Sequence, residues 1–369
     1  MSFSAHHVVP APREDVWAWH TRQGALTRLN APFTFMRPLQ QATDLGKGTS
    51  ILGLPGGLQW KAQHLLSGYQ EGYSFSDKCV NSPLRQVTQW RHTHSFADDP
   101  AGTRITDEVS THIPSAALNS VFAYRQHQLI EDFSFLQRLR AAGLNTQHLT
   151  IAITGSHGSV GTVLTAQLRT AGHTVIQLVR GKAGEGQRHW NPNFPDPALL
   201  HGVDVVVHLA GEPIFGRFNE EHKATIRDSR VGPTQRLARI AGETSSVKAM
   251  VCASAVGFYG SNRGDELLTE DSESGDGFLA DVVRQWEDAC EPARAAGTRV
   301  VNIRTGIAMA GNAGLLPLLR ALFSTGLGGP FGDGKFWFSW VSIDDLTDAY
   351  FRAIVDDSLI GPVNAASPN

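Results

Sequence analysis

At residues 154–161 the chain reads Thr154-Gly155-Ser156-His157-Gly158-Ser159-Val160-Gly161. The apolar run Leu149–Thr154 comes directly before this loop and predicts a buried strand. A helical pattern follows and ends at Gly172, with apolar side chains at Val160, Val163, Leu164 and Leu168. A glycine-rich loop that leaves a strand and opens a helix is typical of dinucleotide-binding proteins. We therefore expect residues 155–161 to bind a dinucleotide; the alternative is a glycine-rich turn without a ligand.

Each glycine of the loop has its own physical role. Gly155 permits the tight turn, Gly158 lets the backbone approach a pyrophosphate, and Gly161 allows close packing of helix against sheet. The N-terminus of the following helix offers unpaired N–H groups and a partial positive charge to the phosphates.

Further apolar runs continue the pattern of buried strands separated by helices. They are Thr174–Val179, Val203–Ala210, Met250–Ala253 and Val300–Ile303. Alternating buried strands and helices predict an α/β doubly wound parallel sheet, a Rossmann domain, over residues 149–369.

The end of the second strand indicates which dinucleotide is preferred. NAD-binding sites usually have a carboxylate there, whereas this chain reads Val179-Arg180-Gly181-Lys182. Arg180 and Lys182 could pair with a 2′-phosphate. NADP(H) is therefore favoured, and NAD(H) stays open because the two cations could also be solvated surface charges.

A second stretch, Asp204–Gly211, predicts another wall of the cofactor site. This strand ends in a turn of small residues, Leu209-Ala210-Gly211, which lets the chain pass under the cofactor. We expect His208, inside the apolar strand, to be packed or hydrogen-bonded rather than catalytic.

The first 140 residues predict a sheet with flanking helices. A strand is expected at Phe3–Val9 and a helix at Arg13–Thr21. Further strands are expected at Thr49–Leu54, Leu58–Leu66, Tyr73–Val80, Arg85–Phe96 and Thr103–Ile113, and a long final helix has an apolar face at Leu118, Val121, Phe122, Leu129, Phe133 and Leu136. This order resembles the α+β helix-grip fold of the polyketide cyclase and START-like superfamily, and the resemblance implies an apolar ligand cavity in residues 1–140. Residues 141–148 are the expected linker.

Composition excludes several functions. The net charge is −3, and the basic residues near Trp60 and Trp90 are scattered, so no nucleic-acid partner is expected. Three separated cysteines form no metal or redox motif. His92 and His94 share a strand face, but no third ligand is evident, so no metal site is expected.

The chain has no signal peptide and no apolar stretch that could span a bilayer, so we expect a cytoplasmic protein with no membrane partner. Its expected partner is a small-molecule substrate or ligand; the oligomeric state is open. The chain stops at Asn369 soon after a strand-like segment, so a C-terminal segment could be missing.

Four stretches resemble the extended short-chain dehydrogenase/reductase superfamily, in particular an atypical branch of the nucleoside-diphosphate-sugar epimerase type. They are Leu209–Ile214, Ile226–Val231, Ser254–Gly260 and Phe338–Leu346. The resemblance implies NAD(P) binding and epimerase, dehydratase or reductase chemistry, and members often carry an N-terminal cyclase-like domain. Asp344-Asp345 lies in the fourth stretch, where we expect acidic residues to cap a helix.

The resemblance fails at the catalytic centre. The superfamily uses a Tyr-x-x-x-Lys pair, whereas Phe278 and Val282 occupy those positions here. Another group would have to handle the proton, and the candidates are Ser254, Tyr259 and Glu212. Each has a structural alternative: Glu212 could cap a helix or pair with Arg217, Tyr259 could pack in a turn, and Ser254 could hydrogen-bond backbone.

Two functions therefore follow from the sequence. The first is an NADP(H)-dependent, epimerase-like oxidoreductase with a non-standard acid or base. The second is a catalytically inactive dinucleotide-binding sensor coupled to an apolar-ligand domain.

Overall fold

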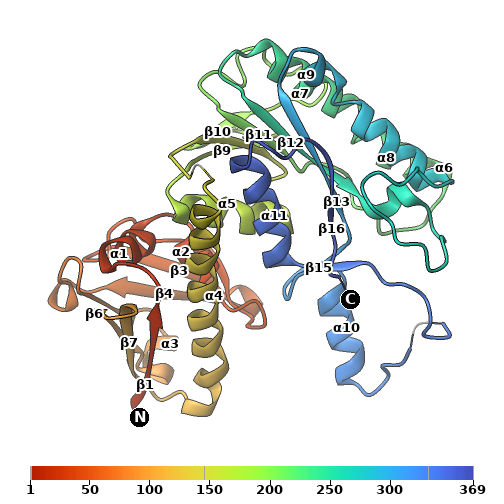
Figure 1. The fold of residues 1–369 in the computed structure, drawn as a ribbon. Coiled ribbons are helices and arrows are strands. Elements are labelled where there is room, and N and C mark those ends of the chain that lie inside the picture. The colour runs from red at the N-terminus through yellow and green to blue at the C-terminus, as the bar shows by residue number, and fades with distance from the viewer. Residues whose placement is uncertain (1, 145, 331, 369) are drawn as a thin grey trace. The chain divides into compact units, whose positions relative to one another are not determined.

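The computed structural model describes residues 2–144, 146–330 and 332–368. The chain divides into two compact units. The first comprises residues 1–143 together with 166–172, and the second comprises residues 144–165 and 173–369. Each unit contains one seven-stranded sheet (Figure 1).

The sheet of the first unit is antiparallel throughout. Its spatial order is β1-β7-β6-β5-β4-β3-β2, so neighbours along the chain are neighbours in the sheet apart from β1, which pairs with β7. The strands are β1 (Ser2–Val9), β2 (Arg37–Gln40), β3 (Thr49–Gly53), β4 (Gln59–His64), β5 (Ser74–Cys79), β6 (Arg91–Asp99) and β7 (Gly102–Ser110).

Helices pack on one face of this sheet. They are α1 (Arg13–Thr21), α2 (Ala25–Arg28), α3 (Leu84–Thr88) and the long α4 (Ser115–Ala141), which packs along β1 (Figure 1). The α1 helix has the predicted bounds. The core joins Trp19 of α1 with Ile105 of β7 and Leu129 of α4, each almost completely buried. Burial of these large apolar side chains stabilises the unit.

One expectation for the first unit was wrong, and one strand was missed. Arg85–Phe96 is not one strand: residues up to Thr88 form α3, and Gln89 ends this helix with a φ of 46° before β6 begins at Arg91. The left-handed conformation at Gln89 breaks the extended backbone that a continuous strand needs. The β2 strand was not expected, because it is mostly exposed and contains Pro38, as an edge strand can.

The sheet of the second unit is parallel, as predicted. Its order is β10-β9-β8-β11-β12-β13-β16. The strands are β8 (Thr150–Thr154), β9 (Thr174–Val179), β10 (Gln187–His189), β11 (Val205–His208), β12 (Ala249–Ala255), β13 (Arg299–Thr305) and β16 (Gly361–Ala365). A separate small sheet pairs β14 (Ile307–Met309) with β15 (Trp340–Ser342).

This order confirms the Rossmann prediction. Starting from β8, the chain builds β9 and β10 on one side and then crosses to β11 on the other. The direction of winding therefore reverses between β8 and β11. Open α/β sheets bind ligands outside the carboxyl ends of their strands at such a switch point.

The helices that follow β8 along the chain are α5 (Ser159–Ala171), α6 (Glu220–Asp228), α7 (Val231–Glu243), α8 (Phe278–Asp288), α9 (Glu291–Ala295), α10 (Leu315–Ser324) and α11 (Ile343–Val355). The second half of α5, from Ala166, groups with the first unit. Asp344 and Asp345 lie in the first turn of α11, where the side chain of Ser342 caps the Asp345 N–H at 3.0 Å. Both carboxylates lie at a helix start, as expected, but the residue that caps the helix is Ser342 and not either aspartate. Throughout the described ranges of both units, no helix has the length and apolar character that a bilayer crossing requires.

Candidate functional site

The glycine loop lies at the switch point, directly after β8. Gly155 has a φ of 65° and packs against the end of β11: a Cβ atom there would lie 2.8 Å from the carbonyl carbon of Leu209. A Cβ atom on Gly161 would collide with the carbonyl oxygen of Gly155. These two glycines are therefore required by the packing of the loop itself.

The tip of the loop is open to solvent. His157, Gly158 and Ser159 are exposed, Val160 is half-buried, and a Cβ atom on Gly158 would approach only the carbonyl oxygen of Gly155, at 3.2 Å. Ser156 is 2% exposed, and its hydroxyl has no hydrogen-bond partner among the described residues. Open backbone at a helix N-terminus together with an unpaired buried hydroxyl fits the phosphates of a dinucleotide.

The hydroxyl of Thr154 joins the two strands that border the switch point. It accepts the N–H groups of Leu209 and Ala210 at 3.1 and 3.2 Å, and it lies 2.7 Å from Nδ1 of His208. Because His208 is completely buried, desolvation lowers its pKa to about 4, with a smaller contribution from the charge of Arg230. His208 is thus a neutral, packed, hydrogen-bonded residue, as expected.

Arg180 and Lys182 lie at the same edge of the sheet as the glycine loop. The parallel register pairs Thr154 with Leu178, and Arg180 comes two residues after Leu178. Both cationic side chains are exposed, and neither has an ion-pair partner among the described residues. They are therefore available to an anionic ligand.

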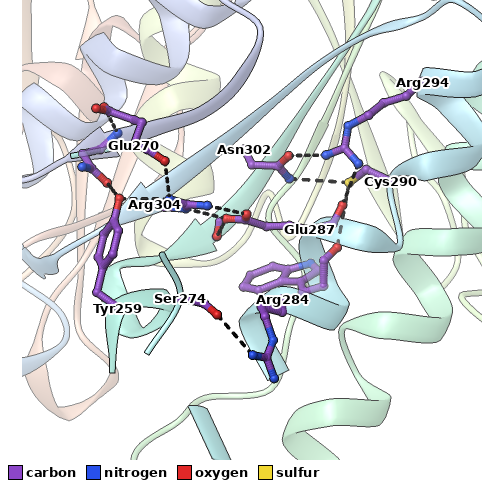
Figure 2. Close-up of polar contacts among 12 residues, drawn as sticks. Tyr259, Glu270, Ser274, Arg284, Glu287, Cys290, Arg294, Asn302 and Arg304 are labelled. Atoms are coloured by element: carbon purple, nitrogen blue, oxygen red, sulfur yellow. Dashed lines mark hydrogen bonds and ion pairs between the residues drawn. The ribbon is translucent and has the colours of Figure 1, made fainter. Parts of the chain in front are cut away.

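Ser254 belongs to a buried charge network with Glu287 and Arg304, and Figure 2 shows the latter two residues. Its hydroxyl donates to Oε1 of Glu287 on α8, at 2.5 Å, and the two carboxylate oxygens of Glu287 each accept an N–H of Arg304 on β13, at 2.9 Å. Burial opposes the charge of Arg304, but Glu287 and the Tyr259 hydroxyl raise its pKa above the ordinary value. This bidentate pair fixes α8 against β12 and β13.

Tyr259 completes the network from the short helix η3 (Val256–Tyr259). Its hydroxyl donates to Oδ1 of Asn364 at 2.7 Å and accepts from Nη1 of Arg304 at 3.0 Å (Figure 2). Ser254 and Tyr259 are 4% and 3% exposed. Both hydroxyls are buried and hydrogen-bonded, Ser254 with the Glu287 side chain and not with backbone as its structural alternative had it. A catalytic role for either stays a prediction.

The two positions of the missing catalytic pair face different surroundings. Val282 is 2% exposed in the core, so a lysine there would have to bury its charge. Phe278 is half-buried at the start of α8, and its ring centroid lies 5.7 Å from the cationic groups of both Lys223 and Arg227 on α6. Phe278 thus serves packing and cation–π contact with α6.

Glu212 differs from the other two candidates because its carboxylate is accessible. Its backbone N–H donates to Ser229 at 3.0 Å and its carbonyl accepts from Arg230 at 2.8 Å, which holds the turn after β11. The side chain is exposed and has no hydrogen-bond or ion-pair partner among the described residues, so neither structural alternative, a helix cap or a pair with Arg217, is present there. Of the three candidates, only Glu212 offers an unengaged titratable group.

Sequence reasoning missed Glu287, Arg304 and Asn364. No local pattern marks them, because they come from three separate elements and meet only after folding. It also missed Asp77 on β5, which lies next to His92 and His94 in the first unit. The available signal was a carboxylate at Asp77, inside the predicted strand Tyr73–Val80 that comes directly before theirs along the chain.

Several known proteins are similar to this chain. Residues 151–364 match the model of the NAD dependent epimerase/dehydratase family. An epimerase family protein of Mycobacterium bovis is 41% identical over 222 residues, which cover 59% of this chain and 73% of that protein.

Two crystal structures extend the similarity. One, of the nucleoside-diphosphate sugar epimerase from Corynebacterium glutamicum, has a TM-score of 0.93 at 54% identity and covers 100% of this chain and 78% of that one. The other, of the human epimerase family protein SDR39U1 with NADPH, has a TM-score of 0.54 at 30% identity and covers 60% of this chain and 75% of that one.

Proposed function

Because this chain belongs to the NAD dependent epimerase/dehydratase family, we propose that it binds NADP(H) at residues 155–161 and acts on a small molecule. The observation that carries the proposal is the open loop tip at the switch point, with two exposed cations, Arg180 and Lys182, just after the adjacent strand β9. We propose a nucleoside-diphosphate sugar as the substrate class, since the Corynebacterium glutamicum relative is described as an epimerase of such sugars.

The bound dinucleotide supplies hydride transfer. In our proposal the N–H groups at the start of α5 and the Ser156 hydroxyl bind its phosphates, and the Leu209-Ala210-Gly211 turn forms the floor. Glu212 holds or releases the proton, since its carboxylate is exposed beside this floor. The Ser254–Glu287–Arg304–Tyr259 network fixes the surrounding elements.

Cofactor preference tests the role of Arg180. We expect the protein to bind NADPH at least tenfold tighter than NADH, because Arg180 can pair with the 2′-phosphate. Arg180→Asp should shrink or invert this ratio, because a carboxylate repels that phosphate and accepts from a free ribose hydroxyl. Both affinities can be measured by fluorescence titration. Arg239→Asp, an exposed site on α7, is the control and should keep the parent ratio. Equal affinities of the parent protein for NADPH and NADH would refute the proposed preference for NADP(H).

Turnover tests the role of Glu212. Glu212→Gln removes the titratable proton and keeps the shape of the side chain, so we expect turnover to fall about 10²–10⁴-fold while NADPH affinity stays constant. The assay follows loss of nicotinamide absorbance from NADPH mixed with a cell extract. Tyr259→Phe, which removes a buried hydroxyl of the network, is the comparison. A loss of turnover in Tyr259→Phe with none in Glu212→Gln would assign the proton to Tyr259.

A second candidate function is a dinucleotide sensor without turnover. It is favoured by one observation: Ser254 and Tyr259 are engaged in a buried network, while Phe278 and Val282 occupy the positions of the missing pair. Binding of NADPH with no turnover across fractionated extracts would support the sensor over the enzyme.

For the first unit we propose a START-like, helix-grip domain that binds an apolar ligand. Support comes from the antiparallel sheet, the long α4 helix and a cavity of about 260 Å³ within this unit. Its walls include Leu52, Trp60, Trp90 and Phe122. A pocket of this kind buries most of the surface of a small apolar molecule.

A further inference from the structure

We propose that Asp77, His92 and His94 bind a divalent transition-metal ion at the wall of the cavity in the first unit. All three side chains line this cavity. One ring nitrogen of each histidine and one carboxylate oxygen of Asp77 lie within 4.8 Å of one another. Two imidazoles with one carboxylate form a ligand set that suits zinc, iron, cobalt or nickel.

The sheet register brings these residues together. Asp77 of β5 pairs directly with His92 of β6, and His94 follows two residues later on the same strand. Directly paired residues, and residues two apart on one strand, point to the same face of a sheet. Three potential ligands therefore come from two adjacent, hydrogen-bonded strands, whose backbone holds their spacing.

A fourth side chain, Asp107 of β7, orients both imidazoles. Its Oδ1 lies 2.8 Å from Nε2 of His92 and 2.9 Å from Nδ1 of His94. Oδ1 of Asp107 accepts a hydrogen bond from this nitrogen of each ring, which leaves the lone pair of each imidazole on its other nitrogen.

Asp107 thus contacts two of the proposed ligands without being one of them. It does not line the cavity, whereas the residues it orients do. Metal-binding histidines almost always donate their second N–H to such a carboxylate, which fixes the tautomer and the ring orientation.

The free nitrogen of His92 faces an acceptor. Its Nδ1 lies 3.8 Å from Oδ2 of Asp77, while Oδ1 of Asp77 accepts from the indole of Trp90 at 3.2 Å. With the His92 proton on Nε2, a lone pair faces a carboxylate oxygen. A cation between Nδ1 of His92 and Oδ2 of Asp77 would remove the repulsion between these two acceptors. A tetrahedral ion about 2.1 Å from each ligand atom holds the two atoms about 3.4 Å apart.

Charge and neighbouring groups also favour a cation. Two buried carboxylates, Asp77 and Asp107, are opposed by one arginine of the cavity wall, Arg125. His64 pairs with Asp77 in the register and lines the cavity, and its buried Nδ1 has no hydrogen-bond partner in the described part of the chain. Three ligands leave a coordination position open toward the cavity, which could hold the polar end of an apolar ligand.

Cobalt is the probe for this site, because bound Co²⁺ absorbs visible light. The full chain is stripped with a chelator, dialysed and titrated with Co²⁺, and we expect one ion per chain that Zn²⁺ displaces. Asp77→Asn keeps an acceptor for Trp90 but loses the charge, and should weaken Co²⁺ binding at least tenfold. Asp107→Asn should weaken it about 10–100-fold.

Two controls separate this site from other possibilities. His6→Gln removes an exposed histidine of β1, and Gly158→Asp alters the dinucleotide loop; both should bind Co²⁺ like the parent. The test of the metal site is therefore independent of whether the protein binds a dinucleotide. No Co²⁺ uptake by the parent chain, or unchanged affinity in folded Asp77→Asn, overturns it. If the variants fail to fold, X-ray absorption on the Co²⁺-loaded parent decides: two or more imidazoles without sulfur support the site, and fewer imidazoles or a sulfur ligand overturn it.

Discussion

Replacing Arg304 by methionine should lower the free energy of unfolding of the second unit by about 3–5 kcal/mol. Arg304 and Glu287 have side chains that are 4% and 12% exposed, and they form a bidentate pair. The variant leaves the mostly buried carboxylate of Glu287 without its cation, and the uncharged Ser254 hydroxyl cannot replace that charge. Chemical denaturation followed by tryptophan fluorescence measures the loss as a shift of the transition midpoint.

An exposed pair of the same chemistry provides the control. Arg263 and Glu266 are also bidentate, with both contacts at 2.8 Å, but their side chains are 25% and 47% exposed. Arg263→Met should change stability by less than about 1 kcal/mol. Adding Glu287→Gln to Arg304→Met removes the unpaired charge and should recover much of the loss. Equal effects of the two arginine variants would show that burial of the Arg304 pair contributes little.

Replacing Gly158 by aspartate should reduce NADPH affinity at least a hundredfold and leave the fold intact. Gly158 directly precedes the first residue of α5, a position where aspartate stabilises a helix by capping its N–H groups. The same carboxylate would occupy and repel the phosphates that we propose to bind there. Fluorescence titration with NADPH measures the affinity, and circular dichroism with thermal unfolding checks the fold.

The structure offers a contrast and a control for this variant. Gly161→Ala should destabilise the protein instead, because its Cβ atom would collide with Gly155. Gly329→Asp adds the same charge where no heavy atom lies within 4 Å of the new Cβ, and should bind NADPH normally. Unimpaired NADPH binding by Gly158→Asp would place the phosphates elsewhere and refute the proposed loop.

Sequence reasoning succeeded where the determinants are local. The β9 strand has the predicted bounds, and α5 ends one residue before Gly172, because alternation, apolar spacing and glycine act within a few residues. The parallel sheet was predicted correctly because several apolar strand segments alternate with helical segments along the chain. In the first unit the same reasoning failed at Arg85–Phe96, where a turn conformation at Gln89 outweighed strand-like composition.

The candidate site shows more clearly which contacts cannot be predicted from the sequence. The glycine loop comes directly after one strand, and Arg180 comes directly after the next strand along the chain. Their proximity could therefore be predicted from the sequence. Tyr259 meets Asn364 across 105 positions of the chain, and Asp77 meets His92 across a strand pair. Such contacts depend on the order and register of the strands in the sheet. The spacing of residues along a single strand or helix gives no information about either.

The bond between Tyr259 and Asn364 has a consequence for biosynthesis. The 105 positions that separate the two residues take a ribosome about 5–20 s to translate, at about 5–20 residues per second. During that interval the nascent chain already contains Glu287 and then Arg304, but Tyr259 has not yet met its acceptor on the last strand. The emerging domain therefore exposes an incomplete polar interior, and this is the period in which chaperones would be expected to engage it.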